Sequence, residues 1–284
     1  MPRFATPNQR SPVPIISNPM EGNHMLKGKT ALVTGSTSGI GHGMAEAFAA
    51  AGANVVLNGF GDPAEIEKTR AAMAEKFGVK VGYSGADMSK PAEIRQMVQD
   101  AIAQFGALDI LVNNAGIQHT APLDEFPEDR WDAILAINLS AAFHAIKAAV
   151  PGMKQRGWGR IINTASVHGL VASTHKAAYV AAKHGIIGLT KVTALELADS
   201  GITCNAICPG WVRTPLVEKQ IEARAQQAGV SVDQAKQQLL SEKQPMTEFT
   251  TPAGIGALAV FLCSDAAATM TGVSLPIDGG WTAQ

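Results

Sequence analysis

The chain of 284 residues is poor in cysteine. It holds Cys204, Cys208 and Cys263, and none of them belongs to a Cys-x-x-Cys pair. An odd, scattered set excludes a disulfide framework and a cysteine-based zinc site, so we expect no bound metal. The composition fits a reducing compartment, and we expect the protein in the cytoplasm.

The chain also lacks a strong net charge and long apolar runs. Its 23 Lys and Arg residues nearly balance 24 Asp and Glu residues, which leaves a formal net charge of -1. This balance gives no electrostatic reason to expect nucleic acid or an anionic membrane as a partner. No continuous apolar run reaches the ~18 residues of a membrane span. Because 46% of the residues are hydrophobic, the chain can bury a sizeable core, which excludes wholesale disorder.

Residues 1–24 differ from the rest of the chain. They hold five of the 15 prolines and show no apolar periodicity, so we expect a disordered tail or an extension there. Residues 25–284 form one expected domain, in which short apolar runs alternate with helical patterns. Strands are expected at 30–34, 54–58, 80–86, 109–113, 160–165, 202–207 and 273–277. Helices are expected at 39–51, 64–77, 91–105, 177–198 and 127–154, the last interrupted near Asn138.

This alternation predicts an α/β fold with a doubly wound, seven-stranded parallel sheet of the Rossmann type. The ligand of such a sheet lies at the carboxyl ends of its strands. The long segment 209–251 is rich in Gln, Ala and Glu with helical spacing, and we expect it to be a helical lid over that site.

One glycine-rich turn lies between the first expected strand and the first expected helix. There Gly35 permits a tight turn, Gly39 lets the backbone approach a pyrophosphate, and Gly41 lets the helix pack on the strand. The helix N-terminus offers free N–H groups and a positive dipole end to phosphates. A purely structural turn is the alternative, because many such turns contain glycine. The residues expected at this dinucleotide site are Gly35, Thr37, Ser38, Gly39, Ile40 and Gly41.

Tyr179 and Lys183 are spaced i, i+4 in a strongly helical segment, so they share one helix face. A phenol has an ordinary pKa of about 10 and is a poor base at neutral pH. A nearby ammonium lowers that pKa, so that Tyr179 accepts an alcohol proton in oxidation and returns it in reduction. Ser166, at the end of an expected strand, is expected to hydrogen-bond the reacting oxygen. Taken alone, the Tyr-x-x-x-Lys pattern is also compatible with helix surface contacts.

Four signatures occur in order and resemble those of the short-chain dehydrogenases/reductases. They are residues 34–41, Asn113-Asn114-Ala115-Gly116, Ser166 with Tyr179-Val-Ala-Ala-Lys183, and Pro209-Gly210 with Asp278-Gly279-Gly280. The resemblance covers residues 25–284 and implies a nicotinamide cofactor and hydride transfer at a secondary alcohol or ketone. It also implies that Lys183 binds the nicotinamide ribose and that Asn138 holds a water that relays protons from Lys183.

The same resemblance implies a homotetramer, with the Tyr179 helix and the C-terminal strand at the interfaces. It implies that Asp87 accepts a hydrogen bond from the adenine amino group, although a helix N-cap is the alternative for this residue. The further cofactor contacts that it implies are Phe60, Asp87, Met88, Asn114, Ala115, Gly116, Tyr179, Lys183, Pro209, Gly210, Val212 and Thr214.

The cofactor is expected to be NAD. At the end of the second strand of such folds, an acidic residue binds the ribose 2′-OH, whereas a basic residue pairs with a 2′-phosphate. Residues 55–61 contain neither type, and no Arg or Lys stands at Ser36, Thr37 or Ser38. Because no cation is placed for the extra phosphate of NADP, the sequence favours NAD.

The substrate is expected to be a small anion, with its alcohol oxygen on Ser166 and Tyr179. Gln118, His168, Lys176, Trp211 and Gln220 stand where the family places substrate contacts. Apart from the tryptophan, they supply hydrogen-bond donors and a positive charge with no carboxylate, which suits a carboxylate beside a secondary alcohol. Taken singly, His168, Lys176 and Gln220 also fit ordinary loop or surface roles.

As a set, these residues resemble the bacterial 3-hydroxybutyrate dehydrogenases. The likeness includes Asn58–Gly61, Ser166–Gly169 and Pro209–Pro215. It implies the reversible oxidation of (R)-3-hydroxybutyrate to acetoacetate.

Three other functions stay open. A 3-oxoacyl-carrier-protein reductase would use NADP and need a basic surface, which is not evident in the sequence. A sugar or polyol dehydrogenase would prefer a neutral polar pocket. A regulatory protein that senses the nucleotide usually lacks the tyrosine or the lysine, whereas Asn138, Ser166, Tyr179 and Lys183 are all present.

Overall fold

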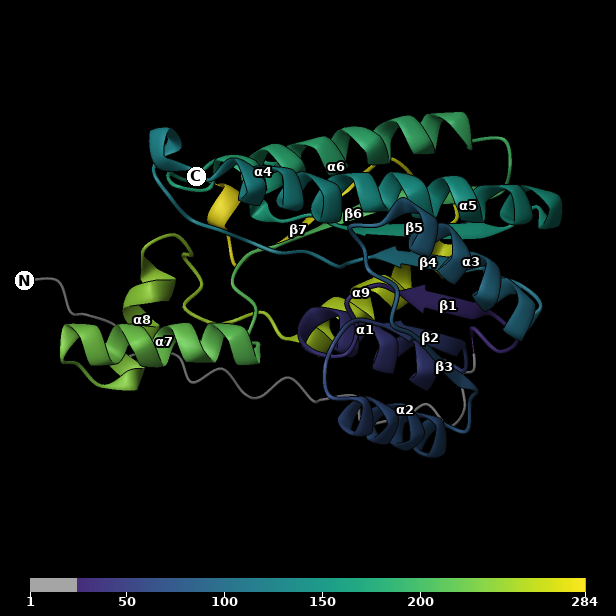
Figure 1. Cartoon of the computed structure of the whole chain (residues 1–284), viewed down its shortest axis with the longest axis horizontal. Coiled ribbons are helices and arrows are strands. Elements are labelled where there is room, and N and C mark those ends of the chain that lie inside the picture. Colours follow the sequence, from purple (N-terminus) through teal and green to yellow (C-terminus); the bar gives the residue numbers. More distant parts are fainter. Residues whose placement is uncertain (1–24, 284) are drawn as a thin grey trace, which may run out of the picture.

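The computed structural model describes residues 25–283, whose elements are arranged as in Figure 1. Residues 1–24, for which a disordered tail is expected, and Gln284 lie outside the described residues. The strands are β1 (Thr30–Val33), β2 (Asn54–Asn58), β3 (Val81–Ser84), β4 (Ile110–Asn113), β5 (Gly159–Thr164), β6 (Ile202–Pro209) and β7 (Ser274–Ile277). The α-helices are α1 (Gly39–Ala50), α2 (Pro63–Phe77), α3 (Pro91–Phe105), α4 (Glu128–Leu135), α5 (Ala141–Arg156), α6 (Ala177–Glu196), α7 (Pro215–Ala228), α8 (Val232–Ser241) and α9 (Pro252–Leu262).

The strands form one parallel sheet of seven, in the order β3-β2-β1-β4-β5-β6-β7. This confirms the predicted doubly wound sheet. The central strands are buried along their whole length, as expected for continuous apolar runs covered on both faces. In register, Leu32 of β1 pairs with Val56 of β2 on one side and Leu111 of β4 on the other. The strand order reverses at β1, and sheets of this type bind their ligands in the crevice beside the carboxyl end of such a strand.

Helices cover both faces of the sheet (Figure 1). On one face, side chains of α1 and α9, such as Phe48 and Ile255, share an apolar cluster with β1 and β2. On the other face, α3 and α5 contribute a second cluster that includes Met97 and Ala145. The helical lid predicted at 209–251 contains α7 and α8, which extend beyond the sheet at the left of Figure 1.

The helix expected at 127–154 is interrupted where the sequence indicated. A π-helical segment, Ala136–Ser140, joins α4 to α5 and carries Asn138. The sequence has no continuous apolar run long enough to span a membrane. The continuous helix Glu128–Arg156 is nevertheless long and apolar enough to cross one, by length and composition alone. Its side chains Ile146 and Met153 instead pack in the cluster under the sheet, so it is a core helix of this fold.

Helix α9 was not anticipated from the sequence. It begins at Pro252, and the Thr251 side chain accepts a hydrogen bond from the N–H of Gly254. A threonine N-cap followed by proline is a recognised start signal, and it could have identified this helix.

Helices α1 and α9 cross closely through glycines. A Cβ at Gly256 would lie 2.7 Å from both the Cβ of Ala47 and the carbonyl oxygen of Gly43. A Cβ at Gly43 would lie 2.5 Å from the Cβ of Pro252. The crossing therefore fixes α1, whose N-terminus follows the glycine-rich turn.

Gly256→Ala is expected to push α1 and α9 apart. Overpacking of this kind costs about 1–3 kcal/mol of unfolding free energy, which urea denaturation measures. Gly152→Ala is the matched control, because its added methyl group meets the end of the flexible Arg156 side chain. Equal stability of the two variants would show that the close crossing does not limit the packing.

Candidate active site

A cleft of about 930 Å³ opens at the carboxyl ends of the strands. Its lining comes mainly from the turns after the strands and from α6. The lining residues that the sequence predicted are Gly35, Thr37, Ser38, Gly39, Ile40, Phe60, Asp87, Met88, Asn114, Ala115, Gly116, Gln118, Ser166, Tyr179, Lys183, Pro209, Gly210, Thr214 and Gln220. The lining also includes residues that sequence reasoning missed, among them Asn58, Gly59, Ile117, His119, Thr120, Thr164 and Pro215.

The remaining predicted residues are not part of this lining. Gly41 packs under the turn, where an added Cβ would lie 2.3 Å from the carbonyl oxygen of Gly35. Val212 is buried in the apolar cluster of α1 and α9. The others outside the lining are Asn138, His168, Lys176 and Trp211.

The glycine-rich turn is tied to the turn after β4. Thr34 Oγ1 accepts hydrogen bonds from the N–H groups of Asn114 and Ala115, at 2.9 and 3.0 Å. Asn114 Nδ2 donates to the carbonyl oxygens of Thr34 and Gly35, at 2.9 and 3.1 Å. A Cβ at Gly35, whose φ is +61°, would lie 2.9 Å from the Cα of Ala115. Glycine is therefore required for this contact, which brings the two halves of the cleft together.

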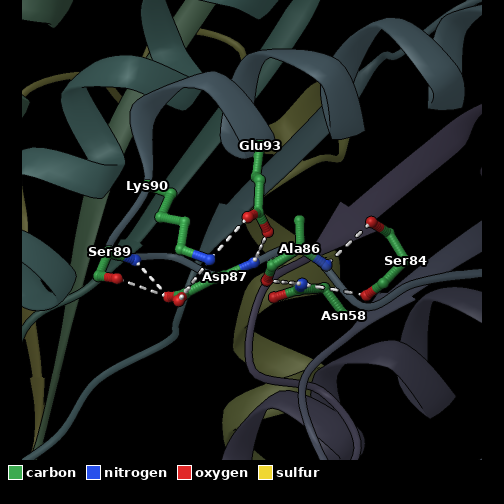
Figure 2. A network of polar contacts seen from close by, with 7 residues as sticks. All are labelled: Asn58, Ser84, Ala86, Asp87, Ser89, Lys90 and Glu93. Carbon is green, nitrogen blue, oxygen red and sulfur yellow. Dashed lines mark hydrogen bonds and ion pairs between the residues drawn. The ribbon is translucent and has the colours of Figure 1, made fainter.

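Asn58, at the end of β2, is a positioning residue that the sequence analysis did not single out. Its Oδ1 accepts from the N–H of Gly35 at 3.2 Å. Its Nδ2 donates to the carbonyl oxygens of Ser84 and Ala86, at 3.1 and 3.0 Å, as Figure 2 shows. The signal available in the sequence was an amide at the end of an apolar run, and the structure shows that this side chain is fully buried. The side chain joins the carboxyl ends of three neighbouring strands.

Asp87 lies at the cleft in the same network (Figure 2). Its carboxylate accepts from the N–H and the hydroxyl of Ser89, at 2.8 and 2.7 Å, and lies 3.6 Å from Lys90 Nζ. Hydrogen bonds from Ser89 and the charge of Lys90 lower the pKa of Asp87. Because Lys90 is the residue that precedes α3, Asp87 is not the N-cap of that helix, and the alternative weighed for it is wrong.

Ser166, Tyr179 and Lys183 converge at one wall of the cleft. Ser166 follows β5, while Tyr179 and Lys183 share a face of α6. Lys183 Nζ donates to the carbonyl oxygen of Thr164 at 2.6 Å and lies 5.5 Å from the centre of the Tyr179 ring. Tyr179 and Lys183 share a helix face as their i, i+4 spacing predicted, and Ser166 was expected beside them from its place at the end of a strand.

The pKa of Tyr179 differs from what the sequence led us to expect, and that of Lys183 is also shifted. Burial lowers the pKa of Lys183 to about 8, so its ammonium loses its proton more easily than an exposed lysine. Burial raises the pKa of Tyr179, and a hydrogen bond with Ser166 opposes that shift. In the protein alone, desolvation therefore outweighs the lowering that was expected for the phenol.

Asn138 fixes the loop after β4. Its Oδ1 accepts from the N–H of Ile117 at 2.8 Å, and its Nδ2 donates to the carbonyl oxygen of Ile117 at 2.9 Å. The side chain is buried and lies beside a small internal cavity rather than the cleft. Its part in a proton relay stays a prediction.

His168 lies behind Ser166. Its Nδ1 is 3.4 Å from Ser166 Oγ, and its Nε2 is 2.9 Å from Ser173 Oγ. The ring packs edge-on against Tyr179 and Trp281. Burial, aided by the charge of Lys176, lowers the pKa of His168 to about 4, so the imidazole is neutral at neutral pH. His168 therefore brings no positive charge to a substrate.

Lys176 is half-buried just before α6, and burial lowers its pKa. No carboxylate of the described residues lies within ion-pair distance of it. Trp211 packs against Trp281 and the apolar side of α7 and α8, including Ile221. Among residues 25–283, no three His, Cys, Asp or Glu side chains gather where they could hold a metal ion.

The cleft fits a dinucleotide. Gly39, with a φ of +59°, and the free N-terminal N–H groups of α1 lie at one end, which suits a pyrophosphate. The exposed Phe60 and the Asp87 carboxylate follow β2 and β3, whereas Lys183 lies on α6 near Tyr179.

Known proteins resemble the chain along most of its length. A family model described as Enoyl-(Acyl carrier protein) reductase matches residues 35–282. D-beta-hydroxybutyrate dehydrogenase of Cupriavidus necator is 64% identical over 260 residues, which cover 92% of this chain and 100% of that protein. The protein of the same name from Rhizobium meliloti is 53% identical and covers 90% of this chain and 99% of its own length. The crystal structure of L-sorbose reductase from Gluconobacter frateurii, complexed with NADPH and L-sorbose, is 31% identical with a TM-score of 0.88, over 93% of this chain and 100% of that one.

The buried neutral His168 is expected to make folding sensitive to mild acid. Its pKa is about 4 in the folded chain, against an ordinary value of 6.5, so between these values the unfolded chain binds the proton and the folded chain does not. Stability is therefore lost as the pH falls from about 6.5 towards 4, and the share of His168 between pH 7 and pH 5 is about 2 kcal/mol.

His168→Gln keeps a polar side chain without this titration. Urea unfolding at pH 7 and pH 5 is expected to show a smaller acid loss in the variant than in the wild type. Equal losses would show that His168 does not titrate in this range on unfolding.

Proposed function

Because the chain belongs to the short-chain dehydrogenase/reductase family and is a nicotinamide-dependent oxidoreductase, we propose that it catalyses the reversible, NAD-dependent oxidation of (R)-3-hydroxybutyrate to acetoacetate. The convergence of Ser166, Tyr179 and Lys183 on one wall of the cleft carries the proposal. The names of the two bacterial relatives support the choice of substrate.

The chemistry is divided among these side chains and the cofactor, which accepts the hydride from the alcohol carbon when bound. Ser166 Oγ holds the alcohol oxygen beside Tyr179, and the Tyr179 oxygen takes the alcohol proton. Because burial raises the pKa of Tyr179, this step depends on positive charge close to the phenol. Lys183 supplies part of that charge and is held in place by its hydrogen bond to the carbonyl oxygen of Thr164.

The proposal that the cofactor is NAD rests on the positions of the charged side chains that line the cleft. Of the described residues that line it, Lys183 is the one lysine or arginine, and it lies on the side of Ser166 and Tyr179. The adenosine side offers the backbone of Gly59, the exposed Phe60 and the Asp87 carboxylate. A 2′-phosphate would meet no cation there, so we propose that NADP binds more weakly.

The substrate carboxylate is assigned to Gln118, Lys176 and Gln220. Gln118 and Gln220 both line the cleft, one after β4 and the other on α7. Lys176 is a half-buried ammonium without a carboxylate partner among the described residues, so an anionic ligand would compensate its desolvation. His168 acts on the substrate through its contact with Ser166, and Trp211 shapes the pocket through the lid.

We further propose a homotetramer in the cytoplasm. Large apolar side chains stand exposed on the outer helices, with Phe143 on α5 and Val192 and Leu195 on α6. Exposed apolar groups of this size on adjacent helices are typical of subunit interfaces. The helix that carries Tyr179 would then lie at an interface, which would hold it rigidly.

Steady-state kinetics test the reaction directly. The wild type is expected to form NADH from (R)-3-hydroxybutyrate faster than from the (S) form, and faster with NAD than with NADP. Tyr179→Phe keeps the ring but removes the ionisable group, so kcat should fall by about 10²–10⁴-fold while NADH binding, followed by fluorescence, is retained.

Each alternative gives a different result in the same assays. Turnover of polyols or of carrier-protein thioesters with NADPH in place of hydroxy acids would identify those activities. NADH binding without turnover of any substrate would indicate a regulatory protein. A Tyr179→Phe variant within threefold of the wild type would remove this residue from the mechanism.

Lys176→Ala tests the carboxylate contact. Loss of a charge-assisted hydrogen bond should lower kcat/KM for 3-hydroxybutyrate by about 10- to 100-fold, with NAD affinity nearly unchanged. The uncharged methyl ester should be a poor substrate of the wild type and should lose much less in the variant. Lys154→Ala, an exposed lysine at the far end of α5, is the matched control and should affect neither substrate. Equal damage to acid and ester would mean that Lys176 acts on Tyr179 or on the helix start.

A further inference from the structure

The loop between Ser166 and α6 contains a backbone conformation that is rare for its residue type. Among the described residues, His175 is the one non-glycine residue with a positive φ, at 64°. This left-handed region is uncommon for residues with a Cβ, although histidine visits it more often than most. Such a conformation persists where the surrounding structure holds it in place.

Two hydrogen bonds hold the loop on either side. The carbonyl oxygen of His175 accepts from the N–H of Ala121 at 3.1 Å, which ties it to the segment after β4 that carries Gln118. Ser173 Oγ lies 2.9 Å from His168 Nε2, which ties the loop to the support of Ser166. The His175 side chain itself is exposed.

Lys176 follows directly and starts α6. Its φ of -126° and ψ of 34° are not helical, while its carbonyl oxygen already accepts from the N–H of Val180 at 2.9 Å. The change of direction at His175 therefore decides where the Lys176 side chain enters the protein. The Lys176 residue is half-buried, and burial lowers the pKa of its ammonium.

We infer that His175 is a positioning residue for substrate recognition: its left-handed backbone, bound to Ala121, sets Lys176 against the loop of Gln118. This inference rests on the proposed function, because it concerns the two sides of the proposed carboxylate site. The backbone conformation of His175 positions Lys176, and the imidazole takes no part in this. The residue therefore determines the affinity for the acid group of the substrate without touching the reacting atoms.

Substitutions at position 175 distinguish an effect of the backbone conformation from an effect of the imidazole side chain. His175→Gly and His175→Asn accept the left-handed conformation and should keep KM for (R)-3-hydroxybutyrate within threefold of the wild type. His175→Val places a β-branched residue there, which disfavours the conformation, and should raise KM about tenfold or more with kcat and NADH affinity little changed. The methyl ester should show a much smaller change in KM than the acid.

A second variant removes the hydrogen bond without altering His175. Ala121→Pro deletes the donor N–H, and the ring Cδ takes the place of its hydrogen, so the carbonyl of His175 must move away from the segment after β4. It should reproduce the KM effect of His175→Val. In a Lys176→Ala background, His175→Val should add less than a twofold change, because the group that it positions is already gone.

The inference is overturned if His175→Gly and His175→Asn raise KM as much as His175→Val, or if both His175→Val and Ala121→Pro leave KM within threefold. Equal effects on acid and ester, or a fall in NADH affinity, would show a general structural role instead. A wild type that oxidises no 3-hydroxy acid would contradict the proposed function itself, which is a different result from normal turnover that is insensitive to His175.

Discussion

The close contact between the turns after β1 and β4 is the constraint on which the site depends. The order of the strands reverses at β1. There the turns after β1 and β4 meet through Thr34, Gly35 and Asn114. The space between Gly35 and Ala115 leaves no room for a side chain on the glycine. The contact joins the glycine-rich turn to the loop that leads to Gln118. Asn58 extends the same tie to the end of β3 through its buried amide.

Around this frame, burial sets the charge state of the reacting groups. The pKa of Lys183 falls to about 8 and that of His168 to about 4, because both are removed from water. The pKa of Tyr179 rises for the same reason. The half-buried Lys176 has no carboxylate partner among the described residues, and Asp87 follows β3, whereas Lys176 directly precedes α6. The resulting charge distribution suits an anionic substrate beside Tyr179.

The two ends of the segment predicted to be a lid are joined to each other. Val212 pairs with Thr250 in an isolated bridge, and the Thr250 N–H donates to the carbonyl oxygen of Trp211 at 3.0 Å. Helices α7 and α8 are held mainly by their own small cluster, which includes Ile221 and Leu239. The sorbose reductase shares the fold at a TM-score of 0.88, so the fold alone does not decide the substrate.

Local patterns in the sequence were sufficient for the parallel sheet, the glycine-rich turn and the meeting of Tyr179, Lys183 and Ser166. The sheet, the turn and the shared face of Tyr179 and Lys183 depend on periodicity or spacing within short segments, and Ser166 was expected from its place at a strand end, so these signals survive in a single sequence. The tertiary structure alone decided that His168 lies behind Ser166, that the Asn138 amide binds the backbone of Ile117, and that Asn58 joins three strands. It also decided the left-handed turn at His175. These features arise from contacts between segments far apart in the chain, or from a backbone angle imposed by such contacts, and no local pattern encodes them.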